Sequence, residues 1–502
     1  MKVRMYLPAF IAGMIVVGAF CFSLIASANA TRQVSGVLRM EIIEPYGEMP
    51  MQIRYFVQYW DGKNFRHTYI ADKSGADFAA VLNKEVVISG RGTDDLFEMN
   101  ELKASSKTAK QNALPAESTS SIQQRSAIGE NPTVAPNTPF TMPQATLGFR
   151  NTLFMLAHRG AVPSTSYTPQ QIKRWGMTDV MSANMFFRNS SFWKFGLKGV
   201  IDPEGDVTPW LPITVGPEDC FQGMMNSWRM QADDLAEAQG FSKTAYKFRV
   251  LLYAPMETCT LTASAQVGVF GDPNGVVYIF MQIPSSGTDE DLQDRLHTLI
   301  HEFNHSFGQA EHSNGQQFEN GPILLQKDHA DSLGTGLIMN HLINRIKFGW
   351  LSPAQRYPVV SSRGRHRILI QTPSRPGKGI GPNVPPPGIF IELRNLDGTL
   401  SDKVMVLETR SLMPYYDMFP SDVQGYVGGL GIRLVSKDLE NTATGTVLID
   451  STPETECCKD APLRPGRTFS MAKYGVTITT AASIRYQVWV TLDLGNNYPS
   501  DL

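Results

Sequence analysis

The central part of this chain is organised around one stretch of sequence, HEFNHSFGQAEH at residues 301–312. Apolar residues recur at spacings of three and four through residues 289–308, which predicts a helix with one buried stripe. Thr288 suits the N-cap position, and the acidic residues 289–291 suit the positive end of the helix dipole. Gly308 then allows the helix to end in a left-handed turn.

Two histidines of this helix are candidate metal ligands. His301 and His305 lie four residues apart, so both imidazoles leave one helix face with their Cβ atoms about 5–6 Å apart. Nitrogens placed in this way can bind one Zn²⁺ at about 2.0–2.1 Å each. Glu302 lies beside that face, where it can serve as a general base toward a water on the metal. The pattern therefore predicts metal-assisted hydrolysis, with a purely structural helix as the alternative.

The third ligand has two candidates beyond Gly308. Glu311 offers a carboxylate, which binds zinc at about 2.0–2.2 Å, and His312 offers a third imidazole. Three neutral histidines leave the metal at its full charge, which makes it a stronger Lewis acid. We therefore favour His312 as the ligand. Glu311 is then available to orient an imidazole from outside the ligand set.

The same stretch resembles the signature of the metzincin zinc peptidases, His-Glu-x-x-His-x-x-Gly-x-x-His. Residues 336–340 (GLIMN) are similar to the methionine turn of that family, in which Met339 forms an apolar floor beneath the metal. Residues 345–351 (RIKFGWL) resemble the following segment of gametolysin-like and immune-inhibitor-type peptidases. The family spacing points to Glu311, one residue before the histidine. His341 lies where some metzincins place a tyrosine that can reach the metal, so it is a reserve candidate for a ligand or a transition-state donor.

This resemblance extends over roughly residues 145–490, including LGFRNTL at 147–153 and APLRPGRTF at 461–469. It implies a zinc-dependent endopeptidase that acts on extracellular proteins or peptides. It also implies that an extended substrate pairs with an edge strand at residues 276–283, with an ordinary core strand as the alternative. Two alternatives remain: an exported adhesion or binding protein whose peptidase domain is inactive, and a zinc hydrolase of a non-peptide bond. Retention of Glu302 argues against the first.

Length and composition indicate a globular chain of about three domains, with 502 residues of which 42% are hydrophobic and 18% charged. The net charge of −2 gives no electrostatic reason to expect nucleic acid as a partner. We expect an α+β fold, with a metzincin-like domain between two β domains. The expected segments are a signal peptide at 1–30, a small OB-like β domain at 31–104, a polar linker at 105–143, the zinc peptidase domain at 144–360 and a β-sandwich-like domain at 361–502. The β domain at 31–104 is either a pro-region or an accessory module.

The N-terminal residues have the features of a secretory signal. Lys2 and Arg4 precede a largely apolar run at 6–25, and Ala28-Asn29-Ala30 provides a small-x-small cleavage site. The alternative is an uncleaved membrane anchor, because the apolar run reaches the roughly 20 residues that a spanning helix needs. Under either interpretation the bulk of the chain is exported, and the membrane is a partner only if the segment is left uncleaved.

Four cysteines follow this segment, an even number that is compatible with disulfides in an exported chain. We expect Cys220 and Cys259 to pair within the peptidase domain. Cys457 and Cys458 are adjacent, and a zinc site there would need further ligands that the neighbouring sequence does not supply.

Overall fold

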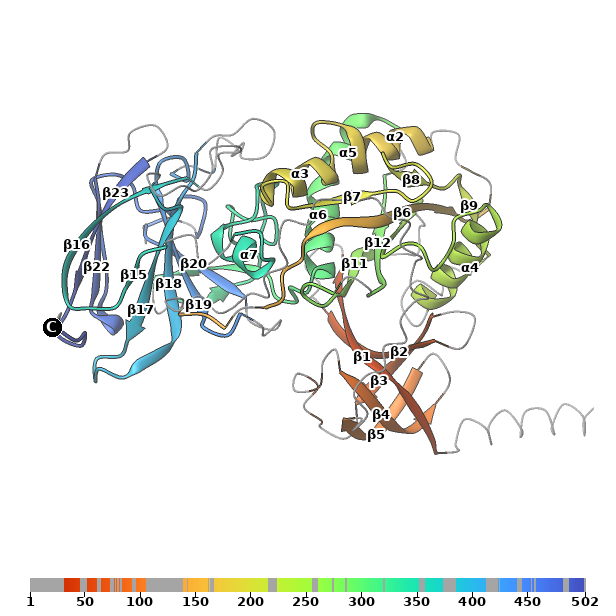
Figure 1. The fold of residues 1–502 in the computed structure, drawn as a ribbon, viewed down its shortest axis with the longest axis horizontal. Helices are drawn as coiled ribbons and strands as arrows, with labels where there is room; N and C mark the ends of the chain where they lie inside the picture. Colours follow the sequence, from red (N-terminus) through yellow and green to blue (C-terminus); the bar gives the residue numbers. More distant parts are fainter. Residues whose placement is uncertain are drawn as a thin grey trace, which may run out of the picture.

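The computed structural model describes most of residues 31–104 and 139–500 (Figure 1). Internal segments outside the described part include 46–51, 215–223, 255–260, 373–384 and 412–422. The described residues form three sheets joined by short helices, a mixed α and β architecture that is rich in sheet. The expected signal at 1–30, nearly all of the expected linker at 105–143, and both Cys220 and Cys259 lie outside the described residues.

Five N-terminal strands close a small barrel. They are β1 (Arg32–Pro45), β2 (Gln52–Trp60), β3 (Phe65–Asp72), β4 (Glu85–Gly92) and β5 (Leu96–Ala104). β1 pairs with both β2 and β4, and β3 and β5 complete the ring by pairing with each other. The barrel encloses an apolar core that includes Leu38, Val57 and Ile88. Runs rich in β-branched and aromatic residues predict strands at 34–43, 52–59 and 85–89, and β1, β2 and β4 confirm them.

β1 also extends beyond the barrel and joins the strands of the middle region. Its residues Met40–Pro45 pair antiparallel with β11 (Leu261–Val267), so barrel and middle strands share one 12-stranded sheet. β11 is antiparallel to β12 (Val277–Gln282), whereas β12, β10 (Phe248–Tyr253) and β6 (Gly148–His158) run parallel. The expectation of an edge strand at 276–283 is wrong, because β12 pairs on both sides. β11 is the last of the middle strands, and β1 covers its outer edge.

Helices cover both faces of these middle strands (Figure 1). On one face, α6 (Leu296–Ser306) packs Ile300 and Phe303 into an apolar core that also contains Val250 and Ile279. On the other face, α4 (Met224–Ala238) contributes Trp228 to a second core. The same region contains β7 (Phe195–Lys198), β8 (Asp206–Val207), β9 (Leu211–Pro212), α2 (Pro169–Lys173), the π-helical turn η2 (Arg174–Thr178) and α3 (Ala183–Ser190). None of the helices within the described ranges is long and apolar enough to cross a membrane.

The helix expected at 289–308 is divided into α5 (Asp289–Asp294) and α6. Its N-cap is confirmed, since the Thr288 side chain accepts a hydrogen bond from the backbone N–H of Asp291. The division falls at Arg295, because its N–H donates to the carbonyl of Leu292, three residues back, at 3.0 Å. His301 and His305 lie beyond this point and share α6.

Two further sheets pack over one apolar core in the C-terminal region. The larger has the order β14-β13-β20-β19-β18-β17-β15, and the smaller β16-β23-β22-β21. The larger consists of β13 (Ser313–Gln317), β14 (Ile323–Leu324), β15 (Val359–Val360), β17 (Gly388–Arg394), β18 (Leu400–Thr409), β19 (Leu430–Ser436) and β20 (Thr446–Asp450); the smaller of β16 (Gly364–Gln371), β21 (Thr468–Met471), β22 (Val476–Thr480) and β23 (Gln487–Leu494), with the 3-10 turn η4 (Ala472–Tyr474) between β21 and β22. Because β13 and β14 directly follow the motif at residues 301–312, this sheet crosses the domain boundary that we expected at residue 360.

The adjacent Cys457 and Cys458 are joined to each other by a disulfide, and both are buried. They belong to a small apolar cluster that also contains Tyr426 and Leu448 of β20. This pairing resolves the two cysteines that the sequence left unassigned.

Candidate metal centre

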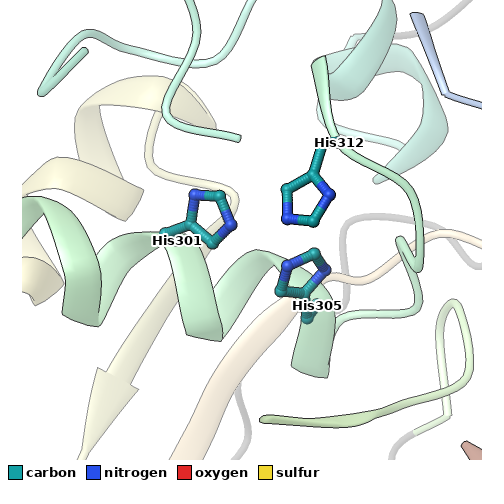
Figure 2. A group of neighbouring side chains, drawn as sticks. All are labelled: His301, His305 and His312. Carbon is teal, nitrogen blue, oxygen red and sulfur yellow. The ribbon is translucent and has the colours of Figure 1, made fainter. Parts of the chain in front are cut away.

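Three imidazoles converge on one point at the end of α6 (Figure 2). His301 and His305 project from α6, and His312 comes from the segment that leads into β13. The ring centroids are 4.9 Å apart for His301 and His305, 5.1 Å for His301 and His312, and 5.0 Å for His305 and His312. One nitrogen of each ring lies within 4.8 Å of the other two. All three side chains are buried.

This donor set fits a zinc ion. Three nitrogens at zinc-binding distance in tetrahedral geometry lie about 3.3 Å apart, so small rotations of the side chains can close the set around one ion. Imidazole is a preferred ligand of Zn²⁺ and of other late first-row metals. Three protein ligands also leave a fourth position for water or substrate, as in catalytic rather than structural zinc sites.

Two backbone carbonyls determine which nitrogen of each helical histidine faces the centre. Nδ1 of His301 lies 2.9 Å from the carbonyl oxygen of Ser332, and Nδ1 of His305 lies 2.7 Å from that of Gln309. A carbonyl oxygen only accepts, so both Nδ1 atoms carry the proton and donate. The lone pair then belongs to Nε2 of each ring, which is the tautomer that a metal ligand requires.

Ser332 was not predicted from the sequence, and it connects the two parts of the site. Its carbonyl fixes His301, while its buried hydroxyl accepts hydrogen bonds from Asn304 on α6 at 2.9 Å and from Asn340 at 3.0 Å. Asn340 directly follows Met339, so Ser332 joins α6 to the segment that contains Met339. No motif marks this serine, because its role depends on the path of the loop rather than on a spacing.

Glu302 is fully buried on α6, next in sequence to His301. It does not contribute a ligand atom to the converging set, which agrees with a role as a base rather than as a ligand. Tyr253, at the end of β10, is a second residue that no sequence motif marks. Burial raises the pKa of the Tyr253 phenol, and the negative charge of Glu302 raises it further, so the two side chains share one electrostatic environment.

The remaining predicted residues lie around the histidines rather than among them. Met339 is buried in the apolar core that includes Phe303 of α6 and Phe307, the C-cap of that helix. Glu311 is partly exposed and lies outside the ligand set; burial raises the pKa of its carboxyl group, an effect that nearby His305 opposes. The structure thus favours His312 over Glu311 as the third ligand.

His341 contacts the C-terminal region instead of the metal centre. Its Nδ1 accepts a hydrogen bond from the backbone N–H of Asn344 at 3.2 Å and so caps α7 (Leu342–Lys347). Its Nε2 lies 2.8 Å from the hydroxyl oxygen of Thr446 on β20. Because both nitrogens have these contacts, the reserve assignment of His341 as a further ligand gains no support.

Lys347 and Asp331 are two buried ionisable residues in the segments that follow the histidines. Lys347 donates from Nζ to the side-chain oxygen of Gln309 at 2.8 Å, and burial lowers the pKa of this lysine to about 7. Burial raises the pKa of Asp331 to about 6, and the neighbouring carboxylate of Asp328 contributes. Since the carbonyl of Gln309 fixes His305, Lys347 helps to hold one ligand in place.

No family model and no curated protein matches this chain.

Proposed function

We propose that this protein is an exported, zinc-dependent endopeptidase of the metzincin type. One observation carries the proposal: three buried histidines converge beside a buried glutamate that follows the first of them in sequence. The antiparallel β11 next to three parallel strands supports a metzincin-like middle region. The closed ring of five N-terminal strands supports an OB-like barrel.

When bound, Zn²⁺ would supply Lewis acidity, which lowers the pKa of a water and polarises a peptide carbonyl. His301, His305 and His312 would hold it, the first two with their Nδ1 protons fixed by backbone carbonyls. The Glu302 carboxylate accepts the proton of the attacking water and returns it to the leaving amine. Burial strengthens this step, because a carboxylate in a low-dielectric site interacts more strongly with a proton donor than it does in water.

Chelator-sensitive proteolysis tests this proposal. We expect the purified, zinc-loaded protein to digest casein or gelatin, to lose that activity when a chelator removes the metal, and to regain it on addition of Zn²⁺. Zinc content measured on the same samples separates the outcomes. Bound zinc without digestion would favour an inactive peptidase domain or a non-peptide hydrolase, and absence of bound zinc would overturn the metal site itself.

The covered edge of β11 leads to a prediction about the N-terminal barrel. An extended peptide can pair with β11 only when β1 is absent, because Met40–Pro45 occupy that edge. Removal of residues 31–138 should therefore raise the specific activity per bound zinc. It should also lower the Tm by several degrees, because buried Arg229 and Gln266 lose their contacts with His67 of the barrel. Each kcal/mol of lost unfolding free energy lowers the Tm by about 2–4 °C.

A chain that is cut once within residues 105–138 but keeps its barrel is the matched control. Its β1 stays paired with β11, so its activity and Tm should remain those of the uncut protein. Activity that rises equally in the cut and the truncated proteins would show that pairing of β1 is not what limits access. Equal activity in all three would make the barrel an accessory module.

A further inference from the structure

We infer that binding of the metal couples helix α6 to the larger of the two C-terminal sheets, hereafter the C-terminal sheet. The coupling arises because strand β20 of that sheet positions the third ligand, His312. This inference rests on the proposed metal site. Two ligands belong to α6, whose apolar face packs on the middle strands, and the third directly precedes β13 of the C-terminal sheet. One ion held by all three would therefore join two sheets that otherwise have separate cores.

The pairing of β13 with β20 sets the position of His312. Ser313, the next residue, pairs with Thr446 at the start of a parallel register that continues to Gln317 and Asp450. At the preceding residue, Gly445, a Cβ atom would lie 2.6 Å from the carbonyl oxygen of His312. The two backbones approach so closely here that only glycine fits without a shift of the ligand segment.

Side chains reinforce this attachment. The hydroxyl of Thr446 donates to that of Ser313 at 3.3 Å and lies 2.8 Å from Nε2 of His341. All three side chains are buried, so these hydrogen bonds are protected from competition with water. Ser313, which follows the third ligand, and His341, two residues after Met339, therefore both contact Thr446, the first residue of β20.

A second attachment holds the loop that orients His301. Arg433 of β19 donates to both carboxylate oxygens of Asp328, at 2.8 and 3.1 Å, and also contacts Glu408 of β18. Glu408 in turn accepts from the backbone N–H of Leu342 at 2.8 Å, where α7 begins. Asp328 and Leu342 flank the loop that contains Ser332, so the C-terminal sheet supports the helical ligands as well as His312.

Coupling of this kind is reciprocal. If the C-terminal sheet strengthens metal binding by positioning His312, bound metal must stabilise the contact of β13 with β20 by the same free energy. Metal removal should then loosen a strand pair whose members are about 130 residues apart in sequence. A site built on α6 alone would show no such effect.

The variant Gly445→Ala tests the first half of this coupling. Its new methyl group displaces the backbone of His312, so we expect Zn²⁺ affinity to fall at least tenfold in competition with a chromophoric chelator. Gly475→Ala is the control: it lies between η4 and β22 of the smaller C-terminal sheet, where φ is 60° and a Cβ would come 2.4 Å from the side-chain oxygen of Asn497. That variant should lose comparable stability but retain its zinc affinity.

Hydrogen exchange of the unmodified full chain tests the second half and does not depend on the folding of a variant. We expect added Zn²⁺ to slow amide exchange in β13 and β20 as well as in α6. Protection confined to α6, or equal zinc affinity in Gly445→Ala and the unmodified chain, would overturn the inference while leaving the metal site intact. If the unmodified chain binds no zinc, the proposed function fails instead.

Discussion

Replacement of Glu302 by glutamine is expected to abolish peptide hydrolysis while the protein keeps its zinc. The amide has the shape of the carboxylate but cannot accept the proton of the attacking water. Loss of such a base costs about 10²–10⁴-fold in rate. The three histidines are untouched, and Glu302 contributes no atom to their converging set, so metal content should remain that of the unmodified protein.

The measurement is kcat/KM on a fluorogenic peptide, together with the zinc content of each preparation. Glu290→Gln is the matched control, because Glu290 is an exposed glutamate on the preceding helix α5 and should keep full activity. Near-normal turnover in the Glu302→Gln protein would contradict the assigned role. Loss of both zinc and activity would indicate that the buried carboxylate maintains the fold of α6, which a melting curve would reveal.

The sequence predicted those parts of the site that depend on local spacing. A helix brings residues four apart to the same face, so the spacing alone pairs His301 with His305. The Thr288 cap follows from a similarly local pattern, whereas the burial of Met339 was expected from the resemblance to the metzincin methionine turn. Helix periodicity could not predict the break at Arg295, because a single N–H that bonds three residues back leaves the apolar stripe unchanged.

The missing parts depend on contacts between distant segments. β20 follows β13 by about 130 residues, and no alternation or turn signal in either strand reveals the other as its partner. The edge of β11 is covered by β1, more than 200 residues earlier, so its neighbour could not be named from the sequence around it. Ser332 acts through its carbonyl on His301, and a carbonyl is common to every residue. The domain boundary expected at residue 360 followed a change in composition. Composition does not reveal that β13, the strand after His312, pairs with the later strand β20.

Replacement of His312 by alanine is expected to lower zinc affinity more than about 100-fold, beyond the 10–100-fold typical of groups that only support a ligand. Glu311→Ala should lower it by a few-fold at most. The metzincin spacing favours Glu311, yet one ring nitrogen of His312 lies within 4.8 Å of a nitrogen of His301 and of His305, next to the start of the β13–β20 pairing at Ser313. The extra residue after Gly308 is accommodated because the strand register, rather than the helix, determines where the ligand lies.

The His312→Ala and Glu311→Ala variants differ by one position in the same loop, so each serves as a control for nonspecific disturbance of that loop in the other. Zinc affinity measured by chelator competition decides between them: loss of metal in Glu311→Ala with retention in His312→Ala would reverse the assignment.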